Sequence, residues 1–320
     1  MNENISPREN WIRAVTFSYP HHIPYEDVIR NVEFEGDMMW MGERGLDHWG
    51  VTWEYELAEY LPMVHAHPIK SPDDLDRYRP PEPVFRLKQS TLERLEGIRR
   101  DQFVLMGFHP TILFERAWFL MGMDNLLMSM IDYPDRVKRL LSRIMDYQVA
   151  IATQYVTCDI DGVFLGDDYG TQQATIMSPN LWREFIKPQV ARLTEVYKRA
   201  DKWIMFHSCG HITEVLDDLI ELGVNIINPC QARANDLAEW GARFSGRVVF
   251  NGGVDTQYTM MLGTPEEVRT ETLLRIEQLG RDPRGGLLLW ADQNMPYSSE
   301  NEQALRETIV EHGVYPLVTP

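Results

Sequence analysis

The chain of 320 residues has few cysteines, and their number argues against a fold built on disulfides. Three thiols, Cys158, Cys209 and Cys230, make a poor disulfide framework. The N-terminal segment also lacks the basic start and apolar core of an export signal. We therefore expect a cytoplasmic protein in a reducing environment.

Long apolar runs and positive charge are scarce as well. No run of 18 or more apolar residues offers a membrane span. The chain has 31 Lys and Arg against 48 Asp and Glu, a net charge of -17. A molecule of this sign repels nucleic-acid phosphates and anionic membranes. The expected partner is therefore a small molecule or another protein.

The composition changes near residue 100. Residues 1–100 are dense in proline and aromatic residues, and the Pro-rich stretch 79–83 is typical of an irregular connector. We expect a cap at 1–100 packed on a main domain at 101–320. The apolar residues of the cap form either a lid or docking surface or, more simply, part of the core. These residues are Trp11, Met38, Met39, Trp40, Met41, Trp49 and Trp53.

After residue 100, short apolar runs alternate with long amphipathic segments. The runs predict strands at 103–108, 163–166, 203–206, 225–228, 248–251 and 287–290. The segments between them predict helices at 134–157, 179–200, 212–222, 265–280 and 300–312. Such alternation predicts a parallel sheet, and at this length a closed (β/α)8 TIM barrel is favoured over an open doubly wound sheet. Neither GxGxxG nor GxxxxGK[ST] follows a strand, which weakens a nucleotide-binding alternative.

Polar residues follow each expected strand, where barrels keep their chemistry. Any one group can be explained as a turn, because turns favour Asp, Asn and Gly, but six groups together indicate a functional rim. The groups are His109, 167–172, 207–209, 228–231, 251–255 and 292–294.

The most informative group is His207-Ser208-Cys209. Residues two apart in an extended segment point to the same side, so the imidazole and the thiol face one pocket. Nitrogen and sulfur are zinc ligands, but a complete site needs three or four of them. An isolated pair of this kind is also compatible with a histidine at a strand end beside an inert thiol.

The chain resembles the uroporphyrinogen decarboxylase superfamily. The resemblance extends over most of the chain and implies a TIM-barrel fold. It is carried by the segments 6–10, 178–188, 207–210, 218–229, 251–257 and 263–268.

Two chemistries compete within that superfamily. The true decarboxylase carries an N-terminal Arg-Gln-Ala-Gly-Arg-Tyr motif for porphyrinogen carboxylates, whereas here Ile23-Pro24 is followed by Tyr25-Glu26-Asp27 without paired arginines. The other branch comprises zinc-dependent methyltransferases that exchange methyl groups with corrinoid proteins, marked by His-x-Cys and a distant second Cys. His207 and Cys209 match the first part, and Gln293 aligns where the second Cys is expected. We therefore favour the methyltransferase and rank the decarboxylase second.

The resemblance assigns roles to the rim residues. His207 and Cys209 are expected zinc ligands with Gln293 as a third, and Asp168 is a ligand or general acid. A centre with Gln293 in place of a thiolate is the stronger Lewis acid, a distinction that weakens if Asp168 or Asp292 coordinates. Cys230 is expected to be a buried, inert thiol. The expected pocket lining is His109, Tyr169, Gln172, Asn228, Gln231, Asn251 and Asp255, although Asp255 has a rival role as a cap of the following turn.

The expected reaction moves a methyl group between a small molecule, such as a methoxylated compound that is O-demethylated, and a corrinoid protein. The cofactors are then zinc and a corrinoid (cobalamin) supplied by the partner, and the resemblance makes a homodimer plausible. A noncatalytic barrel that binds a ligand in the same pocket stays open as an alternative, since a fold alone does not fix a function.

Overall fold

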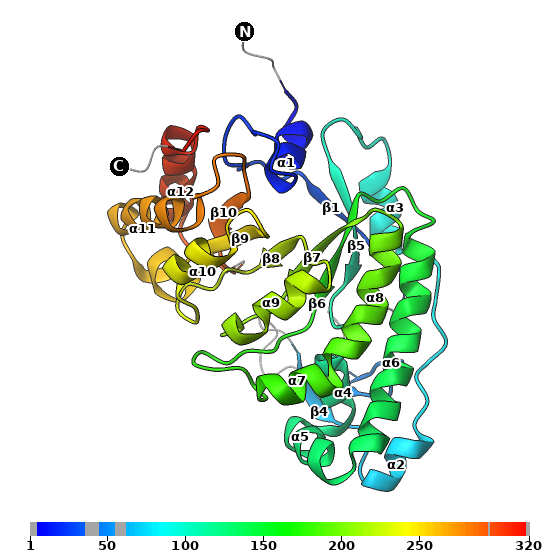
Figure 1. Cartoon of the computed structure of the whole chain (residues 1–320). Coiled ribbons are helices and arrows are strands. Elements are labelled where there is room, and N and C mark those ends of the chain that lie inside the picture. Colours follow the sequence, from blue (N-terminus) through cyan, green and yellow to red (C-terminus); the bar gives the residue numbers. More distant parts are fainter. Residues whose placement is uncertain (1–4, 36–44, 55–61, 294, 318–320) are drawn as a thin grey trace.

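A parallel sheet curled into a half-barrel forms the centre of the molecule (Figure 1). The computed structural model describes residues 5–35, 45–54, 62–293 and 295–317. Within these ranges the sheet has seven strands in the order β1-β5-β6-β7-β8-β9-β10. Their bounds are β1 Ile29–Val32, β5 Val104–His109, β6 Gly162–Gly166, β7 Trp203–His207, β8 Ile226–Asn228, β9 Val249–Val254 and β10 Leu287–Ala291.

The six strands expected after residue 100 are confirmed, each with small shifts of its ends. The expected closed barrel of eight strands is met in part, because in the described ranges β1 and β10 are the two edges of a seven-stranded sheet. Strand β1 comes from the first hundred residues and pairs with β5, Ile29 opposite Val104. The region expected to be a cap therefore also contributes to the barrel sheet.

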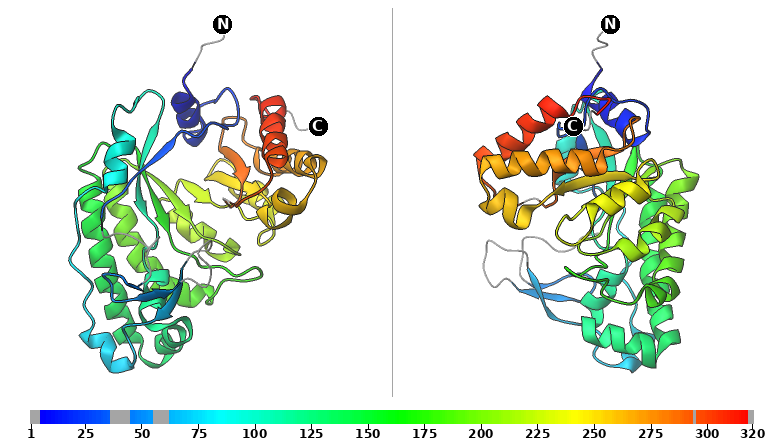
Figure 2. Two further views of the ribbon diagram at one scale, coloured as in Figure 1. Left: turned by 180° about the vertical axis from the view of Figure 1, so that it is seen from behind. Right: turned by 60° about the vertical axis from the view of Figure 1, so that its left-hand side comes forward.

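Helices cover the convex side of this sheet, as the rotated views in Figure 2 show. Prolines at first helical positions mark several starts, and the side chains of Ser178 and Thr264 accept backbone hydrogen bonds as N-caps. The helix expected at 179–200 is two helices, because Pro188 has no N–H to continue the first one. The helical bounds are α1 Pro7–Val15, α2 Pro72–Arg77, α3 Gln89–Leu95, α4 Phe114–Met121, α5 Met123–Asp132, α6 Pro134–Tyr155, α7 Pro179–Phe185, α8 Lys187–Arg199, α9 Thr213–Glu221, α10 Leu237–Phe244, the π-helix η1 Thr256–Met260, α11 Pro265–Leu279 and α12 Ser299–His312.

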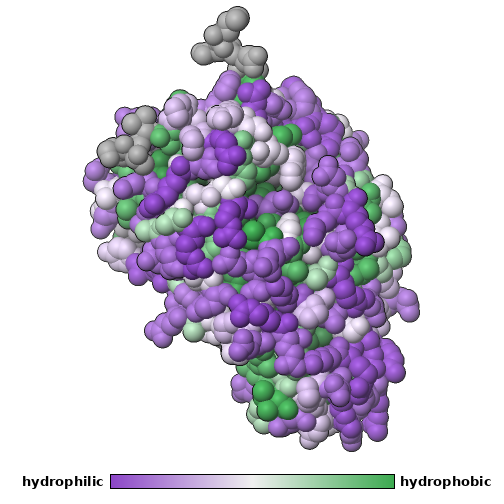
Figure 3. Space-filling model, viewed as in Figure 1, coloured by the Kyte–Doolittle hydropathy of each residue, from purple (hydrophilic) through white to green (hydrophobic). Residues whose placement is uncertain are grey.

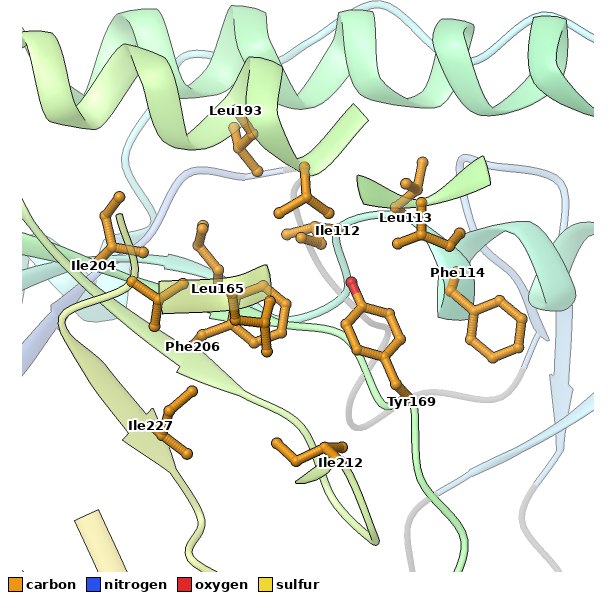
Figure 4. Packing of buried hydrophobic residues seen from close by; sticks show 14 of the residues in the cluster. Ile112, Leu113, Phe114, Leu165, Tyr169, Leu193, Ile204, Phe206, Ile212 and Ile227 are labelled. Atoms are coloured by element: carbon orange, nitrogen blue, oxygen red, sulfur yellow. The ribbon is translucent and has the colours of Figure 1, made fainter. Parts of the chain in front are cut away.

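Two apolar clusters hold the layers together. The larger lies between the sheet and the helices, where Leu165 and Phe206 pack with Leu193 (Figure 4). The smaller joins the side chains of α1 to those inside the half-barrel, including Met106 and Met205. Helix α1 therefore closes the interior at the end where the strands begin.

The remaining N-terminal elements form a small antiparallel sheet of β2 (Gly45–Leu46), β3 (Thr52–Glu54) and β4 (Met63–Ala66). Trp11, Trp49 and Trp53 are each at most 3% exposed, so these three indoles belong to the core. Trp40, Met38, Met39 and Met41 lie outside the described residues.

The face shown in Figure 3 is mostly hydrophilic, in keeping with a charged fraction of 25%. Among the described helices, none combines the length and the apolar character that a membrane span requires.

Candidate functional site

Three potential ligand side chains converge where β6 and β7 end. Asp168 follows β6, His207 is the last residue of β7, and Cys209 lies two residues further on. His207 Nε2 is 3.5 Å from Cys209 Sγ and 3.7 Å from Asp168 Oδ1. One ligand atom from each residue lies within 4.8 Å of the other two. We call Asp168, His207 and Cys209 the ligand cluster.

The two loops that carry the cluster are in direct contact. Cys209 N donates to Asp168 Oδ1 at 2.7 Å, and Tyr169 N donates to Ser208 Oγ at 2.9 Å. A Cβ on Gly210, whose φ is +81°, would lie 2.3 Å from the carbonyl carbon of Gly170. Both loops therefore need glycine at their crossing point, and that contact brings the carboxylate to the thiol.

Behind the cluster, a chain of amides supports the imidazole. His207 Nδ1 is 2.6 Å from Asn228 Oδ1, and Asn228 Nδ2 donates to Asn251 Oδ1 at 2.5 Å. Asn251 Nδ2 in turn donates to the Leu288 carbonyl at 3.1 Å. Asn228 and Asn251, expected to line the pocket, thus lie next to His207 and are bonded to one another.

Gln293 reaches the cluster from the loop after β10. Its Nε2 donates to Cys209 Sγ at 3.0 Å, so the amide nitrogen faces the sulfur. Burial, together with the nearby Asp168 carboxylate, raises the pKa of Cys209 to about 12, and the Gln293 donor opposes that rise. The thiol is therefore protonated at neutral pH unless a cation binds beside it.

Two further carboxyl groups are close to Asp168: Glu115 interacts with it directly, and Asp167 precedes it in the chain and interacts with Glu115. Asp167 is fully buried and accepts from the N–H groups of Phe114 and Glu115 at 2.8 and 2.9 Å, and burial raises its pKa to about 7. Glu115, in the first turn of α4, has a pKa well above its usual range because of burial and the nearby Asp168 and Asp167. Glu115 was not among the residues predicted from the sequence. The signal available was an acid soon after the end of a strand.

Four residues expected in the pocket lie elsewhere. His109 is fully buried, with Nδ1 2.7 Å from Gln148 Oε1 and Nε2 2.6 Å from the Tyr197 hydroxyl, so both ring nitrogens bond to the helix layer. Tyr169 is 1% exposed and packs against Trp182 and Phe206 (Figure 4). The structure does not bring either ring to the cluster.

The other two are Gln172 and Asp255. Gln172 is exposed in a turn. Asp255 accepts from Gln257 N, Tyr258 N and Thr259 N at the start of η1 and pairs with Arg233 at 2.6 Å. Its side chain therefore caps η1, which was the alternative role expected for Asp255 from the sequence.

Three more residues that were considered for the site support the fold around it. Gln231 is 4% exposed and accepts from Gly210 N at 2.7 Å, which fixes the loop that bears Cys209. Cys230 is fully buried, as expected for an inert thiol. Asp292 accepts from Thr256 N at 3.1 Å and is not one of the clustered ligands among the described residues.

The donor set of the cluster suits a divalent transition metal. Imidazole nitrogen, thiolate sulfur and carboxylate oxygen are all zinc ligands, and zinc sites use three or four of them. With one thiolate and one carboxylate, a bound Zn²⁺ would be formally neutral. The pKa of Glu115 and that of Asp167 are raised, and a bound cation nearby would favour the ionised form of each carboxyl group.

The fold and the site together define an α/β barrel-type protein with a candidate metal centre at the carboxyl ends of its strands. Residues 45–289 match the family model described as uroporphyrinogen decarboxylase (URO-D), and the chain belongs to this family. Among solved structures, a methyltransferase from Methanosarcina mazei is similar, with a TM-score of 0.67 and 18% identity over 82% of this chain and 76% of that one. A search of curated proteins found no significant sequence match.

Proposed function

We propose that this protein is a zinc-dependent methyltransferase that moves a methyl group between a small molecule and a corrinoid protein. The observation that carries the proposal is the meeting of Asp168, His207 and Cys209 at the strand ends, where barrels of this type carry out chemistry. The similarity to a methyltransferase of Methanosarcina mazei is consistent with it.

In this proposal His207, Cys209 and Asp168 hold the zinc. Zinc supplies Lewis acidity toward an oxygen or sulfur atom of the methyl donor or acceptor. Gln293 donates a hydrogen bond to the Cys209 sulfur, which lowers the charge density on a thiolate. Because Asp168 completes a neutral set, the enhanced Lewis acidity expected for a centre with Gln293 as third ligand is weakened.

The position of Arg8 gives no support to the decarboxylase alternative. Arg8, the first arginine of the chain, pairs with Asp161 at 2.6 Å. Asp161 directly precedes β6, whereas Asp168 follows the end of the same strand. This arginine therefore lies at the opposite end of the sheet from the cluster, where it does not serve as a clamp for substrate carboxylates.

The metal part of the proposal is tested by elemental analysis of the purified protein. We expect about one zinc per chain in the wild type and a loss of zinc in a His207→Ala/Cys209→Ser variant. Cys158→Ser is the matched control, because Cys158 is a half-buried thiol that follows α6. Absence of zinc from the wild type contradicts the proposal.

The reaction is tested by supplying cob(I)alamin together with a panel of methoxylated compounds and methylthiols. Formation of methylcobalamin that a chelator abolishes and zinc restores supports the methyltransferase. Loss of carboxylates from a porphyrinogen, insensitive to chelators, favours the decarboxylase instead. Stabilisation by a ligand without turnover indicates the noncatalytic barrel.

A further inference from the structure

We infer that Asn228 and Asn251 are positioning residues which fix the tautomer of His207, so that Nε2 presents a lone pair to the ligand cluster. The two amides link the imidazole to the backbone of β10. The part of this inference that concerns zinc rests on the proposed function, whereas the tautomer itself is a property of the metal-free protein.

The direction of the hydrogen bonds from His207 to β10 follows from the last acceptor, the Leu288 carbonyl. The Leu288 carbonyl can only accept, so the Asn251 group 3.1 Å from it must be the NH2. Asn251 then turns its oxygen to Asn228, and the group of Asn228 that faces it, 2.5 Å away, must be NH2 as well. Asn228 is left with its oxygen toward His207.

This oxygen decides which ring nitrogen carries the proton. Asn228 Oδ1 lies 2.6 Å from His207 Nδ1 and cannot donate, so Nδ1 must be protonated. In a neutral imidazole the other nitrogen, Nε2, then has a free lone pair. Nε2 is the atom that lies 3.5 Å from Cys209 Sγ and 3.7 Å from Asp168 Oδ1. One backbone carbonyl on β10 therefore sets the ligand atom at the end of β7.

The registers of the parallel strands position the two amide side chains. His207 lies opposite Asn228 in the β7–β8 register, and Asn251 lies opposite Leu288 in the β9–β10 register. The row of hydrogen bonds thus crosses β7, β8, β9 and β10 at one level of the sheet. Outer partners of this kind orient metal-binding histidines, and their loss costs about 10–100-fold in metal affinity.

The test compares four single variants. Asn228→Ala removes the acceptor for Nδ1. Asn251→Ala removes the group that orients Asn228, whose amide is then free to rotate. Asn251→Asp keeps an acceptor toward Asn228 and so preserves its orientation, although it loses the donor to Leu288. Asn225→Ala is the matched control, because Asn225 Oδ1 accepts from Ile204 N at the other end of the same pair of strands.

The first measurement uses metal-free protein with nitrogen-labelled histidine, in which proton–nitrogen correlation spectra show which ring nitrogen is protonated. His207 is assigned among the nine histidines by its loss in His207→Gln. We expect a proton on Nδ1 in the wild type, Asn251→Asp and Asn225→Ala, and a mixture of tautomers in Asn228→Ala and Asn251→Ala. A wild type protonated on Nε2, or an unchanged tautomer in both alanine variants, overturns the inference.

The second measurement is the zinc dissociation constant, determined by competition with a chromophoric chelator. We expect it to rise about 10–100-fold in Asn228→Ala and Asn251→Ala but to stay near the wild-type value in Asn225→Ala. If the wild type binds no zinc, the proposed function fails while the spectra still decide the tautomer. If Asn251→Ala does not fold, Asn228→Ala and Asn251→Asp make the same comparison. Asn228→Ala removes the acceptor for His207 Nδ1, whereas Asn251→Asp keeps it.

Discussion

At the scale of single residues, the thiol of Cys209 gives a direct test of the site's electrostatics. Its pKa is raised to about 12 by burial and by the nearby carboxylate of Asp168. Only the thiolate reacts with alkylating agents. At pH values below the pKa, the thiolate fraction rises about tenfold for each unit by which the pH increases. In metal-free protein we therefore expect the alkylation rate of Cys209 to keep rising at that slope through about pH 10, without the plateau of an ordinary cysteine.

The rate is measured by mass spectrometry of the Cys209 peptide after timed alkylation with iodoacetamide at several pH values. In Gln293→Leu we expect slower alkylation at every pH, because the Gln293 N–H lowers the pKa of the thiol. Gln172→Leu is the control, since the Gln172 side chain is exposed to solvent in the loop after β6. A rate that levels off near pH 8–9, about where a free cysteine titrates, contradicts the elevated pKa.

The contact between Gly170 and Gly210 leads to a second prediction at this scale. A methyl group on Gly210, whose φ is +81°, would lie 2.3 Å from the carbonyl carbon of Gly170, so Gly210→Ala must push the two loops apart. We expect a loss of about 1–3 kcal/mol in the free energy of unfolding and weaker zinc binding, because Asp168 moves away from Cys209.

Urea unfolding and zinc titration of the same preparation check this prediction. Gly97→Ala is the control for stability, because Gly97 also has a positive φ, +68°, but open space around its Cβ position. Equal losses of stability in the two variants, with zinc binding intact in both, would show that backbone strain alone explains the effect.

At the scale of elements, the six strands after residue 100 were predictable because they are short runs of buried apolar residues between polar turns. Strand β1 was not, because half of Ile29–Val32 is Arg30 and Asn31. The helices α4 and α5 were also not predicted, since they follow β5 within one long, mostly apolar stretch in which few polar residues mark the end of the strand and the start of each helix.

Some residues of the candidate site were likewise predictable from the sequence, and others were not. Asp168, His207 and Cys209 were predicted from their positions at strand ends and Gln293 from the family resemblance, and the structure brings the four together. His109 was misplaced because adjacent strand residues face opposite sides: Phe108 stacks on Phe164 inside the half-barrel, and His109 therefore points to the helices. That choice depends on the register of the sheet, which a list of strand ends does not contain.

Helix α1 is joined to the sheet by Asp161. This carboxylate accepts from Arg8 at 2.6 Å, from Arg100 at 3.1 Å and from Leu105 N at 2.8 Å. Burial alone would raise the pKa of Asp161, but these hydrogen bonds outweigh it and the pKa is lowered. A carboxylate with a lowered folded-state pKa stabilises the fold above its unfolded pKa of about 3.9, and this stabilisation is lost as the pH falls through the folded value.

We expect Asp161→Asn to cost about 2–4 kcal/mol near neutral pH, since it leaves the two guanidinium groups short of a charge partner. The gap should narrow as the pH falls below about 4, and it should close only below the folded-state pKa, where the wild-type carboxyl is protonated in the native protein as well. Urea unfolding followed by tryptophan fluorescence measures both values. The control is Asp101→Asn, whose exposed pair with Arg99 should contribute nothing measurable, and a constant gap across the pH range would refute the assignment.

At the scale of the whole molecule, the candidate site joins parts of the half-barrel that are far apart in the sheet. Asp168 follows β6, His207 and Cys209 belong to the end of β7, and Gln293 follows β10 at the edge of the sheet. Strands β8 and β9 lie between them and contribute Asn228 and Asn251. A metal in the cluster, together with the Gln293 contact to the sulfur, therefore restrains the edge strand against the centre.

We accordingly expect zinc to stabilise the whole fold and to protect β10 in particular. Zinc at about 1,000 times its dissociation constant should add about 4 kcal/mol, which raises Tm by about 5–10 °C. Amide hydrogen exchange in residues 287–293 should slow on zinc addition more than exchange in β5, which carries no ligand of the cluster. In Gln293→Leu the rise in Tm should persist in part while the extra protection of β10 disappears, and in Gln172→Leu both should remain. Equal protection of β5 and β10 by zinc would mean that the metal stabilises the fold as a whole without restraining its edge.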